Sequence, residues 1–415
     1  MKKLITIMFI SLFLLFNIAP AVKAQVKPPV VSADSAVLID ATTGKLLYAK
    51  NKDTAYPPAS TTKIMTILLV LENSKLNDVV TVSKNAEITD GSKIYLFEGE
   101  KISVKELLYG LTLASANDCA VALAEHVSGS TVEFAKLMNK KAKSLGCKNT
   151  NFVNPNGLYD VNHKTSAYDL ALIMRELTKH AEYKKISTTP SYTMAATNKT
   201  KEKRPLWNGN RLVHKDNPYY YKACEGGKTG YTIQSEHSYI AAATRNGQKL
   251  IVALVHDSKK TFFPDSIKLL DYGFNNFELS KCFNKGDAVS HLTLEDGTVL
   301  PLLASKDLYI VKAKNSTLTQ TIKTEQKKLD LSSIKKGDVL STSTLSRGGN
   351  SYTLDLSSGV DYTKKAPALS NSFSKDFLKN LKISSPIIKY LVLTFALLLI
   401  FIIAMIIRRK KRRQF

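Results

Sequence analysis

A near-continuous apolar run, Ile64–Leu71, directly follows the segment Tyr56–Lys63 and constrains the fold more than any other feature of the chain. Two prolines in that segment oppose a helix that extends back through them. The run therefore predicts a helix that starts near Ser60 and is buried on most sides. Ser60 and Lys63 are three residues apart, which makes them neighbours on one face of such a helix. Burial lowers the pKa of a lysine, and a neutral amine can take the proton of a serine hydroxyl.

This Ser-x-x-Lys pattern is weakly diagnostic by itself, because it also begins at Ser332, Ser333 and Ser372, and a serine at a helix start is usually an N-cap. Two further short patterns follow in order, Ser115-Ala-Asn117 and Lys228-Thr-Gly230. Taken alone, the first would be a helix-capping loop and the second an ordinary turn. Their order and wide spacing in one chain make the set of three specific.

The two ends of the chain predict export and membrane anchoring. Residues 1–24 combine a basic start, a short apolar stretch and a small-residue cleavage site, which is typical of a signal peptide. Residues 387–407 are almost all apolar and long enough to cross a bilayer, and the basic residues 408–415 favour a cytoplasmic tail. An uncleaved N-terminal anchor and a buried C-terminal core helix are the disfavoured alternatives. We therefore expect an extracytoplasmic body that is held at the membrane by a single C-terminal span.

The formal net charge of +24 would also suit a nucleic-acid-binding protein. Six of these charges lie in the C-terminal tail and the remaining lysines are scattered, so the expected polyanions are lipids or wall polymers and not nucleic acid. No Cys or His pattern predicts a metal, and no cofactor is expected. An exported chain permits disulfides, but the sequence leaves their pairing open and favours small buried thiols. The four cysteines are Cys119, Cys147, Cys224 and Cys282.

The order of predicted elements indicates an α+β fold. A strand, turn and strand over 35–50 open the chain, helices follow, and a hairpin over 238–256 precedes a helix over 265–274. Strands at both ends predict a sheet that joins early and late segments. After Asn275, short strands separated by Gly, Asp and Asn predict a small all-β domain. The predicted parts are a signal peptide 1–24, a catalytic domain 25–275, a β-rich domain 276–362, a stalk 363–386, a transmembrane helix 387–407 and a basic cytoplasmic tail 408–415.

The three motifs resemble those of the serine penicillin-recognising enzymes, and longer segments resemble the low-molecular-mass penicillin-binding proteins that are D-alanyl-D-alanine carboxypeptidases. The segments that carry the longer resemblance include Asp40–Gly44, Asn154–Leu158 and Gly227–Thr232. The resemblance implies a transpeptidase-like domain, shared with β-lactamases, whose antiparallel sheet is flanked by helices. It also implies an enzyme of the bacterial cell membrane that removes the terminal D-alanine of peptidoglycan pentapeptides through an acyl-enzyme, with covalent inhibition by β-lactams.

The resemblance also implies a role for each motif residue. Ser60 would be the nucleophile, Lys63 the general base and Ser115 the proton relay. Asn117, Lys228, Thr229 and Gly230 would bind substrate, and the backbone N–H groups of Ser60 and Tyr231 would form the oxyanion hole. His163 is expected to support a loop and not to act as a base.

The chain departs from the family pattern where many members have an arginine that binds the terminal carboxylate. Phe262 occupies that place here, with Lys259 and Lys260 nearby, and Arg245 is a further candidate. The alternatives are a β-lactamase, which usually lacks the β domain and the C-terminal span, and a catalytically silent wall-binding protein. The sequence leaves the balance of carboxypeptidase, endopeptidase and transpeptidase activity open.

Overall fold

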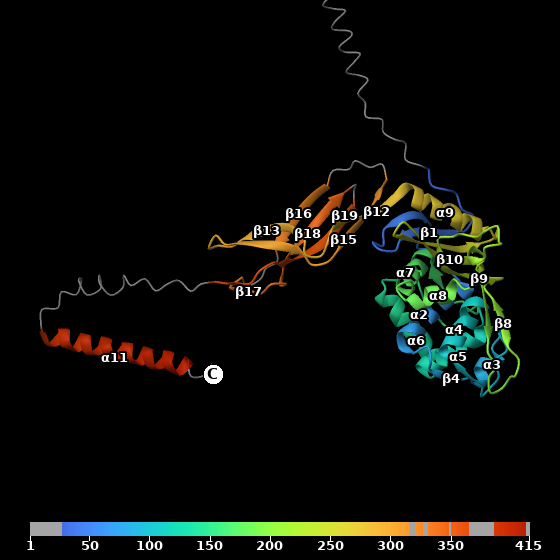
Figure 1. The fold of residues 1–415 in the computed structure, drawn as a ribbon, viewed down its shortest axis with the longest axis horizontal. Coiled ribbons are helices and arrows are strands. Elements are labelled where there is room, and N and C mark those ends of the chain that lie inside the picture. The colour runs from blue at the N-terminus through green and yellow to red at the C-terminus, as the bar shows by residue number, and fades with distance from the viewer. Residues whose placement is uncertain (1–26, 315–319, 327–330, 348–349, 365–385, 412–415) are drawn as a thin grey trace, which may run out of the picture.

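The computed structural model describes residues 27–314, 320–326, 331–347, 350–364 and 386–411. The predicted signal peptide and most of the predicted stalk lie outside these residues. The first folded region is built on one antiparallel sheet of five strands, in the order β2-β1-β11-β10-β9 (Figure 1). Its strands are β1 (Ser35–Asp40), β2 (Leu46–Lys50), β9 (Cys224–Thr232), β10 (Glu236–Arg245) and β11 (Gln248–Asp257). The first strands in the chain thus pair with late ones, and the predicted α+β class is confirmed.

Apolar side chains cover both faces of this sheet, which is why every residue of β1 is buried. Side chains alternate between the faces of a strand. Leu38 packs with α9 (Phe262–Asn276) on one face, and its neighbours Val37 and Ile39 join the core of the helical layer on the other face. The sheet is therefore the middle of three layers.

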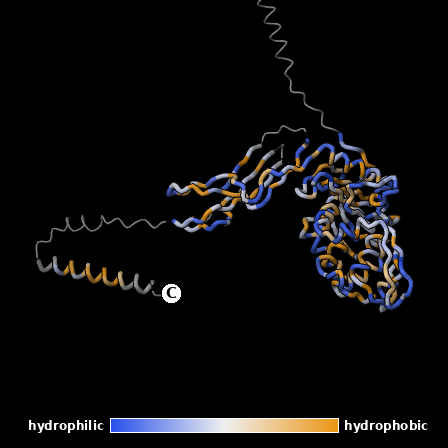
Figure 2. Tube along the Cα trace, viewed as in Figure 1, coloured by the Kyte–Doolittle hydropathy of each residue, from blue (hydrophilic) through white to orange (hydrophobic). Residues whose placement is uncertain are grey.

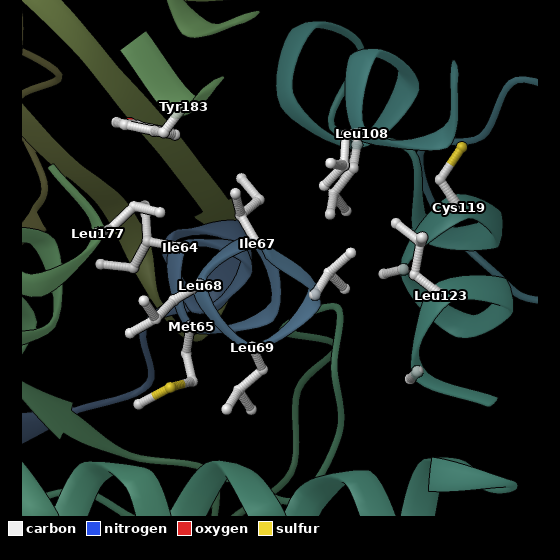
Figure 3. Close-up of a cluster of buried hydrophobic side chains, with 14 of the residues drawn as sticks. Ile64, Met65, Ile67, Leu68, Leu69, Leu108, Cys119, Leu123, Leu177 and Tyr183 are labelled. Carbon is white, nitrogen blue, oxygen red and sulfur yellow. The ribbon is translucent and has the colours of Figure 1, made fainter. Parts of the chain in front are cut away.

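The helical layer surrounds α2 (Lys63–Asn73), which follows a short 3₁₀ turn, η1 (Ala59–Thr62). All residues of α2 from Lys63 to Val70 are buried. Figure 3 shows Ile64, Ile67 and Leu69 of this helix pointing in different directions into the surrounding core. A helix that is apolar all round must be buried in this way. The predicted central helix is confirmed, although Ser60 lies in the 3₁₀ turn and not in the α-helix. The other helices of the layer are α3 (Lys84–Ile88), α4 (Val104–Leu113), α5 (Asn117–Ser128), α6 (Thr131–Ser144), α7 (Ala167–Leu177) and α8 (Ala181–Ser187).

Three short antiparallel pairs and one 3₁₀ turn complete the first region. The pairs connect separate segments beside the helical layer. They are β3 (Ala55–Tyr56) with β6 (Thr165–Ser166), β4 (Val79–Thr81) with β5 (Lys101–Ser103), and β7 (Ser191–Met194) with β8 (Arg204–Trp207), and the turn is η2 (Arg211–Val213).

The second folded region is all β, as predicted, and has its own apolar core, which includes Leu300, Leu345 and Leu356. A five-stranded sheet in the order β13-β14-β19-β18-β16 is joined by the pairs β12-β15 and β17-β20. The strands are β12 (Phe277–Phe283), β13 (Ala288–Thr293), β14 (Val299–Ala304), β15 (Leu308–Ala313), β16 (Gln320–Gln326), β17 (Ser333–Ile334), β18 (Val339–Arg347), β19 (Asn350–Ser358) and β20 (Tyr362–Thr363).

The last element is α11 (Pro386–Lys411), which is strongly apolar in its middle (Figure 2). Its described side chains, residues 390–404, are all exposed. A search of the described residues for a helix with the length and hydropathy of a membrane span found none. The transmembrane helix expected at 387–407 is not confirmed by this search and stays a prediction.

Candidate active site

Ser60 and Lys63 are brought together where η1 runs into α2. The Lys63 Nζ atom lies 2.8 Å from Ser60 Oγ. β9 packs directly against this turn: a Cβ added at Gly230 would lie 2.8 Å from the Pro58 carbonyl oxygen and 3.0 Å from the Ser60 nitrogen. Only a glycine permits this approach. The first and third motifs therefore meet at Ser60.

The Lys63 amine is fully buried and makes two more hydrogen bonds. It donates to Asn117 Oδ1 at 2.7 Å and to the carbonyl oxygen of Asn156 at 2.6 Å. Burial, and then the positive charge of Lys228, hold the pKa of Lys63 well below its ordinary value. The amine is thus placed beside the serine in an environment that favours its neutral form.

The second motif lies between α4 and α5. Asn117 is the first residue of α5, and its side-chain Nδ2 donates to the Asp90 carbonyl oxygen at 2.6 Å, which directs Oδ1 toward Lys63. Ser115 is half-buried in the preceding turn and has a left-handed backbone with φ of 57°. A non-glycine residue in this region is uncommon and is concentrated at functional sites. The structure therefore joins the second motif to the first through Asn117.

The third motif lies on β9 at the edge of the sheet. The Lys228 amine is buried and donates to the Thr229 carbonyl oxygen at 2.9 Å, and burial lowers the pKa of Lys228 to about 7. Thr229 is half-buried, and its Oγ1 lies 3.8 Å from the position of a Cβ added at Gly209. Tyr231 is exposed and its ring stacks on His237. Along β9, beside Ser60, the chain therefore presents the Lys228 amine, which can be charged or neutral near pH 7, then the Thr229 hydroxyl, and then Gly230, which lets the backbone approach closely.

His163 supports the turn that carries Ser60, as predicted, through contacts with both of its ring nitrogens. Its Nδ1 accepts the backbone N–H of Val153 at 3.1 Å, so its Nε2 carries the proton and donates to Thr62 Oγ1 at 2.8 Å. Burial lowers the pKa of His163 to about 4. The imidazole is therefore neutral at physiological pH and has no free lone pair to act as a base.

The candidates for the missing arginine fall into two groups. Arg245 pairs with Asp271 at the far end of β10, seven residues from Ser238, which is the residue opposite Gly230. At about 3.3 Å per residue this is roughly 23 Å along the strand, so Arg245 is excluded as a ligand of the site. Phe262 is buried against the His237 and Tyr239 rings, whereas Lys259 and Lys260 are exposed.

Asn156 is a site residue that the sequence did not reveal. It lies in the segment Asn154–Leu158, which carries part of the family resemblance, and the chain there brings the Asn156 backbone carbonyl to Lys63. A backbone acceptor carries no signature in residue type, so only the resemblance of this segment to the family hinted at a role. The described residues place Ser60, Lys63, Asn117 and the Lys228–Gly230 strand in one site.

Comparisons with known proteins agree with this geometry. A family model described as D-alanyl-D-alanine carboxypeptidase matches residues 22–259, and one described as penicillin-binding protein 5, C-terminal domain, matches residues 277–362. The chain is 36% identical to D-alanyl-D-alanine carboxypeptidase DacF of Bacillus subtilis, across 84% of this chain and 91% of that protein. It is 32% identical to D-alanyl-D-alanine carboxypeptidase DacA of Haemophilus influenzae, across 82% and 88%. The crystal structure of penicillin-binding protein 5 from Haemophilus influenzae superimposes with a TM-score of 0.70 at 32% identity, covering 82% of this chain and all of that one.

Proposed function

Because this chain belongs to the D-alanyl-D-alanine carboxypeptidase family of serine peptidases, we propose that it removes the terminal D-alanine from peptidoglycan stem pentapeptides through an acyl-enzyme on Ser60. The family's fold, a penicillin-binding-protein transpeptidase domain followed by an all-β domain, is the fold of this chain. The chain is a serine hydrolase of this type, and what remains to be assigned is the role of each residue.

The hydrogen bonds of Lys63 carry the proposal. A neutral amine has two N–H donors and one lone pair. Asn117 Oδ1 and the Asn156 carbonyl are both acceptors and use the two N–H donors. The lone pair is then left for the third neighbour, Ser60 Oγ, at 2.8 Å. Lys63 in its neutral form is thus positioned to take the Ser60 proton as the hydroxyl attacks the carbonyl of the penultimate residue.

The other motif residues complete the reaction. The backbone N–H groups of Ser60 and Tyr231 stabilise the tetrahedral oxyanion. Ser115 relays the proton from Lys63 to the nitrogen of the departing D-alanine, which breaks the peptide bond. Water then attacks the acyl-enzyme and regenerates Ser60.

Substrate binding is assigned to Asn117 and to the β9 strand. One Nδ2 proton of Asn117 bonds Asp90, and the second is available for the amide oxygen of the stem peptide. The charge of Lys228 and the hydroxyl of Thr229 bind the terminal carboxylate, and Gly230 lets the peptide lie close to the strand. The exposed amines of Lys259 and Lys260 are the remaining candidates to replace the family arginine.

Labelled penicillin tests this assignment on the exported body of the protein. Mass spectrometry should find one adduct, on Ser60, that persists for many minutes, and purified protein should release D-alanine from a pentapeptide. The Ser60→Ala variant should lose both while keeping its thermal unfolding temperature. Rapid turnover of penicillin without D-alanine release would instead favour a β-lactamase, and the absence of both reactions would favour a silent wall-binding protein.

For the ends of the chain, we propose a signal peptide at 1–24, a catalytic domain at 25–275, a β-rich domain at 276–362, a stalk at 363–386, a span at 387–407 and a basic cytoplasmic tail at 408–415. The exposed apolar side chains of residues 390–404 support a bilayer-embedded helix, since water would not favour such a surface. The catalytic domain would then act outside the cytoplasm, with the β-rich domain as a spacer between membrane and wall. Cell fractionation tests the anchor: the full chain should pellet with membranes, and a chain ending before residue 387 should be released.

A further inference from the structure

The loop from Asp90 to Leu96 bonds to two consecutive residues at the start of α5 by opposite kinds of hydrogen bond. Asn117 donates to the loop, from its backbone N–H to the Ser92 carbonyl at 2.6 Å and from Nδ2 to the Asp90 carbonyl at 2.6 Å. Asp118 accepts from the loop, with Oδ2 lying 3.0 Å from the Ile94 nitrogen and 3.1 Å from the Leu96 nitrogen. The loop has no helix or strand of its own between these points, and these hydrogen bonds tie it to α5. The buried side chains of Ile94 and Leu96 also hold its far end in the core.

The Asp118 carboxylate is fully buried, its hydrogen-bond partners are backbone N–H groups, and no cation contacts it within the described part of the chain. Burial raises the pKa of this carboxyl, against the effect of its three backbone donors. A buried carboxylate is costly, so it is retained where its acceptors are needed. The α5 N-terminus also favours a negative charge at this position.

From this geometry we infer that Asp118 is a positioning residue for the reaction: it anchors the Asp90–Leu96 loop, and the loop in turn fixes the amide of Asn117 with its oxygen toward Lys63. The inference rests on the proposed function of Lys63 as the base. If the loop moved, the Asn117 amide would lose the Asp90 acceptor and could rotate. Its NH₂ group would then face the Lys63 amine, and a donor would replace the acceptor on which the arrangement of the Lys63 lone pair depends.

Substitution of Gly91 is a second, independent way to disturb the orientation of the Asn117 amide. Its backbone is left-handed, with φ of +83°, and an added Cβ would lie 2.5 Å from Asn117 Nδ2. The Gly91→Ala substitution therefore places a methyl group of the loop in steric conflict with the Asn117 amide and leaves the Asp118 carboxylate unchanged.

Asp169 is a matched control, because it is equally placed in its own helix but serves a different loop. It lies in the first turn of α7, is buried, and accepts from the backbone nitrogens of Lys148 and Asn149 at 2.7 to 3.2 Å. An Asp169→Asn substitution should cost stability as Asp118→Asn does, with no route to Asn117.

The experiment measures the second-order rate constant of acylation by fluorescent penicillin, and thermal unfolding, for the purified exported body and the three variants. Asp118→Asn and Gly91→Ala should lower the rate constant at least tenfold at a temperature where each is folded, and Asp169→Asn should change it less than twofold. The acid limb of the pH profile should move to lower pH in Gly91→Ala, because the Lys63 ammonium loses the Asn117 oxygen that favours it while the neighbouring charges stay in place. Burial and Lys228 lower the pKa of Lys63, whereas Cys119 and Asp118 raise it. Asp118→Asn therefore also moves the limb directly through its lost charge, and Gly91→Ala is the variant that tests positioning. A loss of stability alone would not move this limb.

Acylation within twofold of wild type in Asp118→Asn and Gly91→Ala would overturn the inference, and so would an equal loss in Asp169→Asn. If Asp118→Asn does not fold, Gly91→Ala decides by the same criterion. A wild-type protein that neither binds penicillin nor releases D-alanine would instead refute the proposed function. The two failures are therefore distinguishable.

Discussion

The two folded regions of this protein treat charge in opposite ways. In the first region, several charged side chains are buried, and three of them, Lys63, Asp118 and Lys228, belong to the site or to the start of α5 beside it. In the described part of the second region, the buried polar residues are the serines Ser341, Ser343 and Ser358, and charged groups form pairs at the surface. Burial of charge is costly and shifts pKa values, and at the site it produces the two lysines with lowered pKa, Lys63 and Lys228. From this contrast we infer that the first region carries out catalysis and that the second region has a structural role.

The largest effect on activity is expected when the buried Lys63 amine of the first region is removed. Lys63→Met keeps the length of the side chain but removes the proposed base, so acylation by penicillin should fall about 10³-fold, within the range for general-base catalysis. Lys45→Met is the control, because Lys45 donates instead to the Val311 carbonyl of the second region. Its acylation rate should stay within about twofold of wild type. Stopped-flow acylation of both variants would contradict the assignment if their rates were similar.

A methyl group at the contact of β9 with the serine turn should have the next largest effect. In Gly230→Ala, the new Cβ would meet the Pro58 carbonyl and the Ser60 nitrogen, which are backbone atoms and cannot rotate away. Displacement of the nucleophile by a fraction of an ångström should lower kcat/KM for D-alanine release about 100-fold. Unchanged kcat/KM, measured with a pentapeptide, would show that the strand does not have to lie so close.

How far these features could be predicted depends on whether a local pattern encodes them. The buried helix after Ser60 and the buried strands β1 and β11 follow from nearly continuous apolar runs, and the order and spacing of the motifs indicated Lys63 and Lys228. The Asn156 carbonyl could not be predicted in this way, because it is a backbone atom positioned by a distant turn. The same holds for β16, a polar strand at the edge of its sheet without apolar alternation, which pairing with β18 alone defines.

The buried Lys228 amine of the first region should also have a moderate effect, on the pH dependence of kcat/KM. Burial lowers the pKa of Lys228 to about 7, and a lysine is charged below its pKa, so the free enzyme loses this carboxylate-binding charge as pH rises through 7. We expect kcat/KM to fall above pH 7, approaching about tenfold per pH unit. Lys228→Arg keeps its charge at high pH and should flatten this limb, even if its absolute rate is lower. An unchanged limb in this variant would assign the titration to another group.

The smallest effect on activity is expected from the core of the second region. Leu354 is buried there, and Leu354→Ala should destabilise that region by about 2–5 kcal/mol through lost burial and a cavity. Because the buried charged groups of the site lie in the other region, D-alanine release from a soluble pentapeptide should remain within about twofold of wild type. Chemical denaturation followed by activity and by circular dichroism would separate the two losses. A parallel loss of activity and β structure would show that the second region does more than hold the first at a distance from the membrane.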